Sequence, residues 1–277
     1  MIKIISDSSS DLFQFEDVPF ASVPLKVRTS VKEYVDNGPE EVKEMCDYLS
    51  SVKEKTSSSC PNAAEWLDAF AEDDDNICFT ISSNLSGSYN SCLQAKQIYE
   101  EEHDHKVVII DTLTAGAEER IIIEKAAEYI LQGLKIDEIE EKLHEYQDSV
   151  HTYFLTSSVQ NLVSNGRIPS FVGKAISILK ISMVGMGSDE GRIKIVHESR
   201  TSRKAIDYIV ERMIERGYTG GKFYMSTCLN TDGVEYFRKV ILEKFPEAKI
   251  QVLPTGILCS YYVEENGIIL GFEGNKE

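Results

Sequence analysis

Long apolar stretches are missing from this sequence of 277 residues: no run reaches about 18 apolar residues, the length that a membrane-spanning helix requires. The amino terminus, MIKIISDSSSD, carries one lysine and reaches Asp7 almost at once, which is not the pattern of a secretory signal peptide. The sequence therefore predicts a cytoplasmic protein without stable insertion in a membrane.

Cysteine and histidine are also scarce. None of the six cysteines stands in a Cys-x-x-Cys pair, and several fall within apolar patterns, where a cysteine usually packs as a small hydrophobic residue. His103 and His105 stand close together in EEHDHK, but no other ligand-type cluster accompanies them, so a solvated loop is a better interpretation than a metal pair. This usage disfavours a disulfide scaffold and a zinc site, and we predict no metal and no cofactor.

Positive charge is outnumbered, since 29 Lys and Arg residues stand against 46 Asp and Glu residues, for a formal net charge of −17. Coulomb repulsion makes nucleic acid and anionic membrane surfaces poor partners for such a chain. Its hydrophobic content of 42% is enough to bury a core, and its length suits one large domain or two ordinary ones.

What the first half does contain is a regular alternation of short apolar runs and helical patterns. The runs predict strands at 2–5, 23–27, 77–81 and 106–110, and the apolar spacing predicts helices at 39–53, 62–72, 115–133 and 135–149, with a further helix after the serines of 82–88. Strands that alternate with helices are typical of a parallel, doubly wound sheet.

The second half has a different rhythm. Strand-like runs at 153–156, 181–186 and 191–196, the last two arranged as a hairpin, are followed by helical patterns at 200–216 and 232–244 and by the apolar segments KFYMS, KIQVL, GILCSYYV and GIILGF. We therefore predict an α/β protein of two domains. Residues 1–149 form a parallel-sheet α/β domain, and residues 150–277 form an α+β domain with a mixed or antiparallel sheet.

Hydroxyl side chains gather where the predicted strands end. DSSSD follows the first strand, SSNLSGS follows the strand at 77–81, Asp111-Thr112 follows the next, and KTSSSC precedes a helix. A serine before a helix is first of all an N-cap, so for any single serine capping is the better interpretation. Loops at the carboxyl ends of parallel strands nevertheless form ligand sites, and the turn at Ser86-Gly87-Ser88 offers free N–H groups at a helix start.

Three kinds of site could use such a rim. A phosphate cradle usually brings a lysine, an arginine or a glycine-rich loop, and the segment has one glycine and no basic residue. A nucleophilic serine needs a base, typically histidine, and a setting such as Gly-x-Ser-x-Gly, neither of which is present. A clamp for a carboxylate needs only hydroxyls and N–H groups, and it fits best.

The motifs DSSSDL (7–12), KTSSSCP (55–61), ISSNLSGSY (81–89), IIDTLTAG (109–116), NGRIPS (165–170) and ESRTSRKAI (198–206) resemble, in order and spacing, those of the DegV family of bacterial fatty-acid-binding proteins. The resemblance covers nearly the whole chain. It implies an N-terminal domain similar to part of the dihydroxyacetone-kinase fold, a C-terminal domain that holds the acyl chain, and a carboxylate at their junction. It also implies a protein that is no enzyme by itself and presents a long-chain fatty acid to a separate fatty-acid kinase.

The family's motifs also imply roles for individual residues. Its head-group threonine and serine match Thr56 and Ser86, and the arginine of its Gly-Arg-Ile matches Arg167. The resemblance therefore predicts fatty-acid binding by Thr56, Ser57, Ser86, Gly87, Ser88, Arg167 and Tyr262, and a partner-facing role for Arg200 and Arg203.

The sequence departs from the family pattern in three places. Ser58-Ser59 replaces Gln-Pro, Glu118-Glu119-Arg120 interrupts an apolar stretch, and Tyr262 falls near the position of a histidine that the family associates with the head group and the kinase step. Tyr262 could equally be a core aromatic of a strand, and two other functions stay open. One is a diverged phosphotransferase-like enzyme that uses Asp7 and Asp111, and the other is a carrier of a different lipid.

Overall fold

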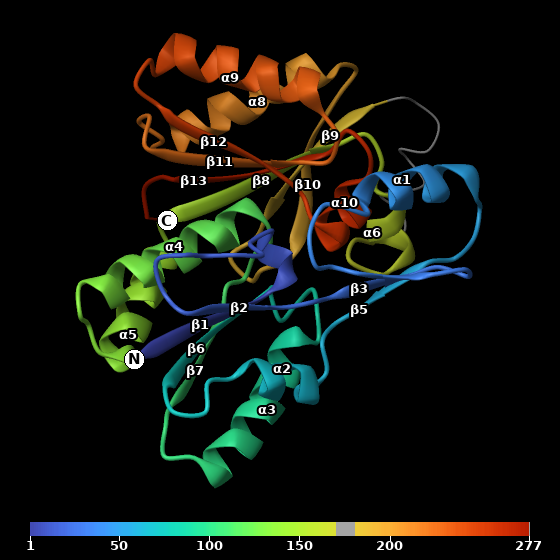
Figure 1. The fold of residues 1–277 in the computed structure, drawn as a ribbon. Helices are drawn as coiled ribbons and strands as arrows, with labels where there is room; N and C mark the ends of the chain where they lie inside the picture. The colour runs from blue at the N-terminus through green and yellow to red at the C-terminus, as the bar shows by residue number, and fades with distance from the viewer. Residues whose placement is uncertain (170–180, 277) are drawn as a thin grey trace.

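A computed structural model of the chain describes residues 1–169 and 181–276. Its first sheet consists of β1 (Ile2–Asp7), β2 (Phe20–Val23), β6 (Asp75–Thr80) and β7 (Val107–Asp111), in the order β2-β1-β6-β7. Every pairing in this sheet is parallel, which confirms the α/β prediction for the first half. Figure 1 shows the sheet in the lower half of the molecule.

Helices cover both faces of this sheet, because successive residues of a strand point to opposite sides. They are α2 (Ala63–Ala69), α3 (Ser88–Glu102), α4 (Ala117–Leu131) and α5 (Ile136–Gln147). Ile4 of β1 belongs to a buried cluster with α4 and α5, whereas its neighbour Ile5 belongs to a cluster with α2 and α3. The carboxyl ends of the strands are buried against the second half of the chain, where Ser82 Oγ donates to the carbonyl of Gly191 at 2.8 Å.

The second half forms a separate sheet of six strands. In order, these are β10 (Ile193–Ser199), β9 (Ser182–Gly187), β8 (Val150–Thr156), β13 (Ile268–Glu273), β11 (Lys222–Thr227) and β12 (Lys249–Pro254). Among the described strands of this sheet, β11 and β12 pair in parallel and the other pairings are antiparallel, which confirms the predicted mixed sheet and the hairpin of β9 and β10. The helices α8 (Ser202–Glu215) and α9 (Thr231–Lys244) lie on one face of the sheet, above it in Figure 1.

A small third sheet from the first half packs against the second half. It contains β3 (Lys26–Arg28), β4 (Glu33–Val35) and β5 (Ser57–Ser59), with β3 in the middle. The predicted strand at 23–27 is thus two strands, because Pro24 lacks the N–H that would continue a ladder. One buried cluster joins this sheet and α1 (Val42–Ser51) to α6 (Gln160–Ser164), α10 (Ile257–Val263) and Phe154 of β8. The predicted domain boundary between residues 149 and 150 stays a prediction.

The apolar segment GILCSYYV contains the helix α10, which spans residues 257–263, so the alternative that Tyr262 is an aromatic of a strand is wrong. The first N–H groups of that helix are bound by carboxylates from the distant N-terminal part of the chain. Gly256 N donates to Asp11 Oδ1 at 2.7 Å, and Ile257 N and Leu258 N donate to Asp36 Oδ1 and Oδ2 at 2.6 and 3.1 Å. Tyr262 is therefore a helical residue and not the aromatic of a strand.

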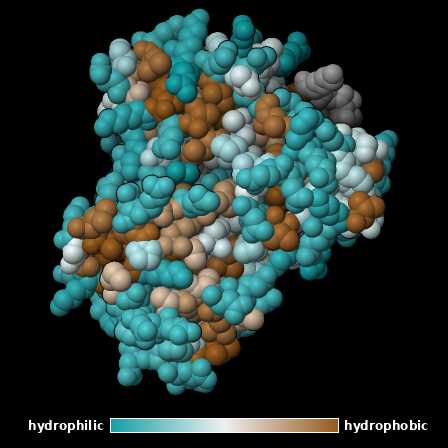
Figure 2. All heavy atoms as spheres, in the orientation of Figure 1, coloured by the Kyte–Doolittle hydropathy of each residue, from teal (hydrophilic) through white to brown (hydrophobic). Residues whose placement is uncertain are grey.

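Acidic and other polar side chains dominate the surface, as the net charge requires. Figure 2 shows hydrophilic residues over most of the visible face, with hydrophobic residues gathered in separate patches between them. Within the two described ranges, none of the helices combines the length and the apolar character that crossing a membrane would need.

Candidate functional site

An apolar pocket lies between the inner face of the six-stranded sheet and the loops that end β6 and β7. Its apolar lining includes Leu25, Ile81, Leu85, Phe154, Leu258 and Ile269. These residues come from both halves of the chain, so the pocket forms only when the two sheets and α10 pack together. The loops that follow parallel strands contribute to its wall, in agreement with the prediction from the sequence.

One region of this lining is polar, where Ser58, Ser86, Arg167 and Tyr262 come together. The hydroxyls of Ser58 and Tyr262 lie 2.6 Å apart, and the Arg167 guanidinium lies 5.9 Å from the centre of the Tyr262 ring. Arg167 Nε donates to the carbonyl of Leu85 at 2.9 Å, which fixes the guanidinium beside the serine loop. Hydroxyl donors and a cation in one place are complementary to a carboxylate.

The alternation of side chains along the segment of β5 sets which of its hydroxyls face the pocket. Ser57 is exposed, whereas Thr56 and Ser58 share the opposite side by the two-residue period. Thr56 Oγ1 lies 2.7 Å from the hydroxyl of Tyr261, which also accepts from Asn165 Nδ2. Ser58 lines the pocket, whereas Thr56 and Ser57, the two residues predicted from this segment, do not. The two-residue alternation along KTSSSC is the local signal by which Ser58 could have been identified.

The serine loop after β6 divides its side chains between two tasks. Ser86 lines the pocket, but the buried hydroxyl of Ser88 donates to Asp7 Oδ2 at 2.6 Å. Gly87 lies at the start of α3, and a Cβ there would stand 3.2 Å from the sulfur of Cys60, so the glycine permits β5 to approach this helix. The Ser88 hydroxyl therefore stabilises the loop.

Asp7 and Asp111, the acids of the alternative enzyme hypothesis, also hold loops. Asp7 Oδ2 accepts from Ile81 N at 3.0 Å as well as from Ser88, and burial raises the pKa of this carboxyl above its ordinary value. Asp111 Oδ1 accepts from Ser83 N at 3.1 Å and from Leu113 N at 3.2 Å. Both carboxylates are thus engaged with backbone donors next to the pocket.

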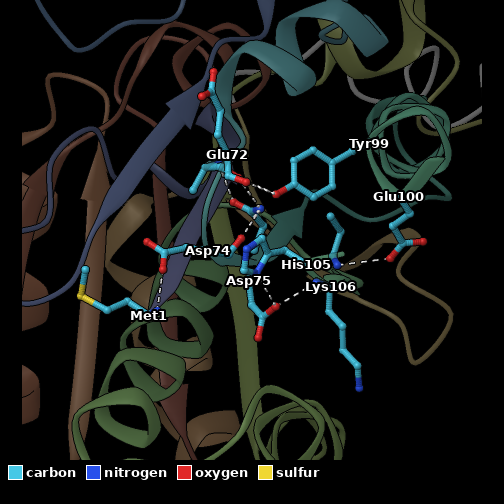
Figure 3. Close-up of polar contacts among 11 residues, drawn as sticks. Met1, Glu72, Asp74, Asp75, Tyr99, Glu100, His105 and Lys106 are labelled. Atoms are coloured by element: carbon cyan, nitrogen blue, oxygen red, sulfur yellow. Dashed lines mark hydrogen bonds and ion pairs between the residues drawn. The ribbon is translucent and has the colours of Figure 1, made fainter. Parts of the chain in front are cut away.

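Residues 1–169 and 181–276 contain no group of three or more His, Cys, Asp or Glu side chains that could hold a metal ion. Figure 3 shows the surroundings of His105, at the ends of β6 and β7 remote from the serine loops. His105 Nδ1 lies 3.7 Å from Asp75 Oδ1, which also accepts from Lys106 N at 2.8 Å. These polar contacts fasten the start of β7 to β6.

Arg200 and Arg203 are exposed, and neither lines the apolar pocket. Arg200 lies between β10 and α8, and Arg203 is in the first turn of α8 with its guanidinium 5.3 Å from the centre of the Tyr236 ring. Their role toward a partner stays a prediction.

Two acids that the sequence analysis did not select hold a pocket helix in place. Asp11 and Asp36 bind the first N–H groups of α10, the helix that carries Leu258 and Tyr262. Burial raises the pKa of Asp11 to about 6, and burial together with the nearby Asp11 raises the pKa of Asp36 to about 8. No local signal marks them, because each lies more than two hundred residues from the helix in the sequence.

Comparisons with known proteins agree with these observations. The model of a family described as "Uncharacterised protein, DegV family" matches residues 1–273. A DegV domain-containing protein of Streptococcus pneumoniae strain R6 is 35% identical over 276 residues, which are 98% of each chain.

Two similar structures contain a fatty acid. The Fatty Acid Kinase (Fak) B3 protein of Streptococcus pneumoniae, loaded with linoleic acid, has a TM-score of 0.95 and 35% identity over 99% of this chain and 100% of its own. A DegV family protein from Eubacterium eligens, loaded with heptadecanoic acid, has a TM-score of 0.95 and 31% identity with the same coverage. On the extent of these matches, the chain belongs to the DegV family.

Proposed function

We propose that this protein binds a long-chain fatty acid, with the carboxylate among Ser58, Ser86, Arg167 and Tyr262 and the alkyl chain along the apolar wall. The observation that carries the proposal is the pocket itself, which is apolar over most of its lining and has hydroxyls and a guanidinium gathered in one region. The similar structures loaded with heptadecanoic and linoleic acid support it.

The energetics suit such a ligand. Burying an alkyl chain contributes about 0.8 kcal/mol for each methylene, so ~14 methylenes contribute roughly 11 kcal/mol before entropic losses. A buried carboxylate must then be hydrogen-bonded, because an unpaired buried ion is costly. Among the residues predicted from the sequence, Ser86, Arg167 and Tyr262 line the pocket, which supports this role for them. Thr56 acts through Tyr261, and Ser57, Gly87 and Ser88 lie outside the pocket lining.

The protein acts, in this proposal, as a cytoplasmic carrier and not as an enzyme. It presents the acid to a separate fatty-acid kinase, as the name of the similar Fak B3 protein suggests. Arg200 and Arg203 are exposed and available to such a partner. Tyr262, in place of the family histidine, donates a hydrogen bond but does not shuttle protons near neutral pH. Residues 1–149 and 150–277 are the proposed domains.

Mass spectrometry of the ligand extracted from purified protein tests this function. A long-chain fatty acid is the expected finding. A prenyl or other polar lipid would instead identify a carrier of a different class. An empty site, with ATP turnover that survives stringent purification and is lost in Asp7→Ala, would establish the enzyme hypothesis.

The variant Ser86→Ala is expected to bind a fluorescent fatty acid roughly 10-fold to 100-fold more weakly, because it loses one charge-assisted hydrogen bond worth about 1.5–3 kcal/mol. Ser57→Ala is the matched control, since Ser57 is an exposed serine on the other side of β5. Equal affinities for Ser86→Ala and the parent protein, with both folded, would place the carboxylate elsewhere.

A further inference from the structure

A second cavity, of about 320 Å³, adjoins the apolar pocket. Leu113, Thr152, Met186 and Gly187 line both, so the two cavities meet at a shared wall. We refer to the second cavity as the polar chamber, because Glu118, Gln147, His151 and Arg216 are among its lining residues. Glu118, one of the residues that departs from the family pattern, lines the polar chamber and not the pocket with the carboxylate site.

The polar chamber lies at the end of the apolar pocket that is away from the carboxylate site. Along one face of β8, Phe154 and Thr152 line the apolar pocket, and Thr152 and Val150 line the polar chamber. At the other end of β8, Thr156 Oγ1 donates to the carbonyl of Val263, the residue after Tyr262. The strand rises about 3.3 Å per residue, so Thr152 lies about 13 Å along β8 from Thr156, the residue that contacts the segment carrying Tyr262.

The apolar pocket is also short for a long acyl chain. It encloses about 100 Å³, against about 320 Å³ for the polar chamber. A cavity volume of about 10–15 Å³ is needed to hold one water, so the apolar pocket holds on the order of eight waters. This is roughly half of the water that a long acyl chain displaces. The distal part of such a chain therefore extends toward the shared wall and beyond it.

Glu118 presents a buried polar group to this path. Its Oε2 accepts from Thr114 Oγ1 at 2.7 Å, and its side chain lines the polar chamber. Burial raises the pKa of Glu118 to about 8, so near neutral pH the carboxyl is largely protonated and can both donate and accept a hydrogen bond.

The charges around the polar chamber suit a neutral polar group better than a second carboxylate. Arg216 Nη1 donates to His151 Nδ1 at 3.0 Å, so part of this guanidinium is already engaged. Asp148 and Asp189, both exposed, add negative charge to the lining. A hydroxyl adds no charge and pairs with the protonated carboxyl of Glu118.

We propose that the polar chamber is a subsite for a hydroxyl group on the distal half of the acyl chain, with Glu118 as its hydrogen-bonding partner. This inference rests on the proposed function, and it specifies the ligand class as fatty acids that include chain-hydroxylated ones. A distance of about 13 Å corresponds to about ten carbons of an extended chain with staggered C–C bonds of about 1.5 Å.

Competitive titration with octadecanoic, 12-hydroxyoctadecanoic and 3-hydroxyoctadecanoic acid tests the subsite. The affinity ratio is the affinity for the 12-hydroxy acid divided by the affinity for octadecanoic acid. The parent protein is expected to bind the two acids within about 3-fold of each other, and Glu118→Leu is expected to lower the affinity ratio about 10-fold. Glu118→Gln, which keeps hydrogen-bonding atoms, should preserve most of the ratio. The 3-hydroxy acid is the control ligand, because its hydroxyl stays at the carboxylate end. Its affinity relative to octadecanoic acid should be the same in the parent protein and in the Glu118 variants.

A second variant acts independently of the carboxyl. A Cβ at Gly187 would stand 3.3 Å from Thr152 Cγ2 at the shared wall, so Gly187→Val should obstruct the passage and disfavour the 12-hydroxy acid. An unchanged ratio in folded Glu118→Leu, or in Gly187→Val if Glu118→Leu does not fold, overturns the subsite alone. Failure of the parent protein to bind any of these acids overturns the proposed function and the subsite together.

Discussion

The variant Asp36→Ala is expected to lose roughly 3–5 kcal/mol of unfolding free energy, a large share of the stability of an ordinary domain. Asp36 is 1% exposed, and its two oxygens accept from the backbone N–H groups of Ile257 and Leu258. Alanine leaves both donors buried without an acceptor, and each such group costs about 1–3 kcal/mol. The same change removes a contact between the two halves of the chain.

Urea unfolding followed by circular dichroism measures this loss. Asp47→Ala is the control, because Asp47 is an exposed acid on α1 whose contact with Lys43 is a surface ion pair worth a few tenths of a kcal/mol. Asp36→Asn, which keeps one acceptor oxygen, should fall between the two. If Asp36→Ala were as stable as Asp47→Ala, the carboxylate would not hold α10, and the account of the helix would be wrong.

The same helix shows what the sequence could not predict. The spacing of apolar residues predicted most of the other helices and strands, because periodicity is local and the faces of β1, with Ile4 and Ile5 on opposite sides, follow from it directly. The segment at 257–263 contains two adjacent tyrosines and a valine, which favour a strand by propensity. Its helix is fixed by Asp11 and Asp36, and contacts of such sequence separation leave no local pattern.

Some residues of the candidate site could be predicted from the sequence and others could not. Ser86, Arg167 and Tyr262 were identified by resemblance and lie together at the pocket. Ser58 was passed over because the family motif drew attention to Thr56, although the two-residue period along β5 places both on one side. Glu118 could be noticed as a departure, but its function could not be inferred, since the polar chamber exists only when α4 and β8 meet.

The second large expected effect is a fall in stability as pH rises. Burial raises the pKa of Asp36 and of Glu118 to about 8, and that of Asp11 to about 6. Burial, and then the neighbouring Asp7, also raise the pKa of Glu119 well above its ordinary value. The folded protein therefore keeps protons that the unfolded chain, with carboxyl pKa values near 4, has released.

The geometry around Ser9 supports this retention of protons independently. Ser9 Oγ lies 2.6 Å from Asp7 Oδ1 and 2.6 Å from Glu119 Oε2. A hydroxyl has one hydrogen and can donate to only one of these oxygens. The other short contact requires a proton on a carboxyl, so at least one of the two acids is neutral in the folded state.

The direction of the effect follows from proton linkage. A carboxyl whose folded pKa is raised contributes its stability fully below the unfolded pKa and loses it as pH rises through the folded pKa. Each retained proton changes the unfolding free energy by about 1.4 kcal/mol per pH unit, so Asp36 and Glu118 together lower it by on the order of 5 kcal/mol between pH 5 and 7. The protein should be more stable at pH 5 than at pH 7.

Urea unfolding of the parent protein and of Glu118→Gln across pH 5 to 8 tests this dependence. Glutamine cannot release the proton, so the variant should show a slope reduced by about 1.4 kcal/mol per pH unit below pH 8. Glu145→Gln, at an exposed position on α5, should keep the parental slope. Stability that rises between pH 5 and 7 would mean that these buried carboxyls are ionised in the folded protein. In that case Glu118 would meet a ligand hydroxyl as an acceptor only.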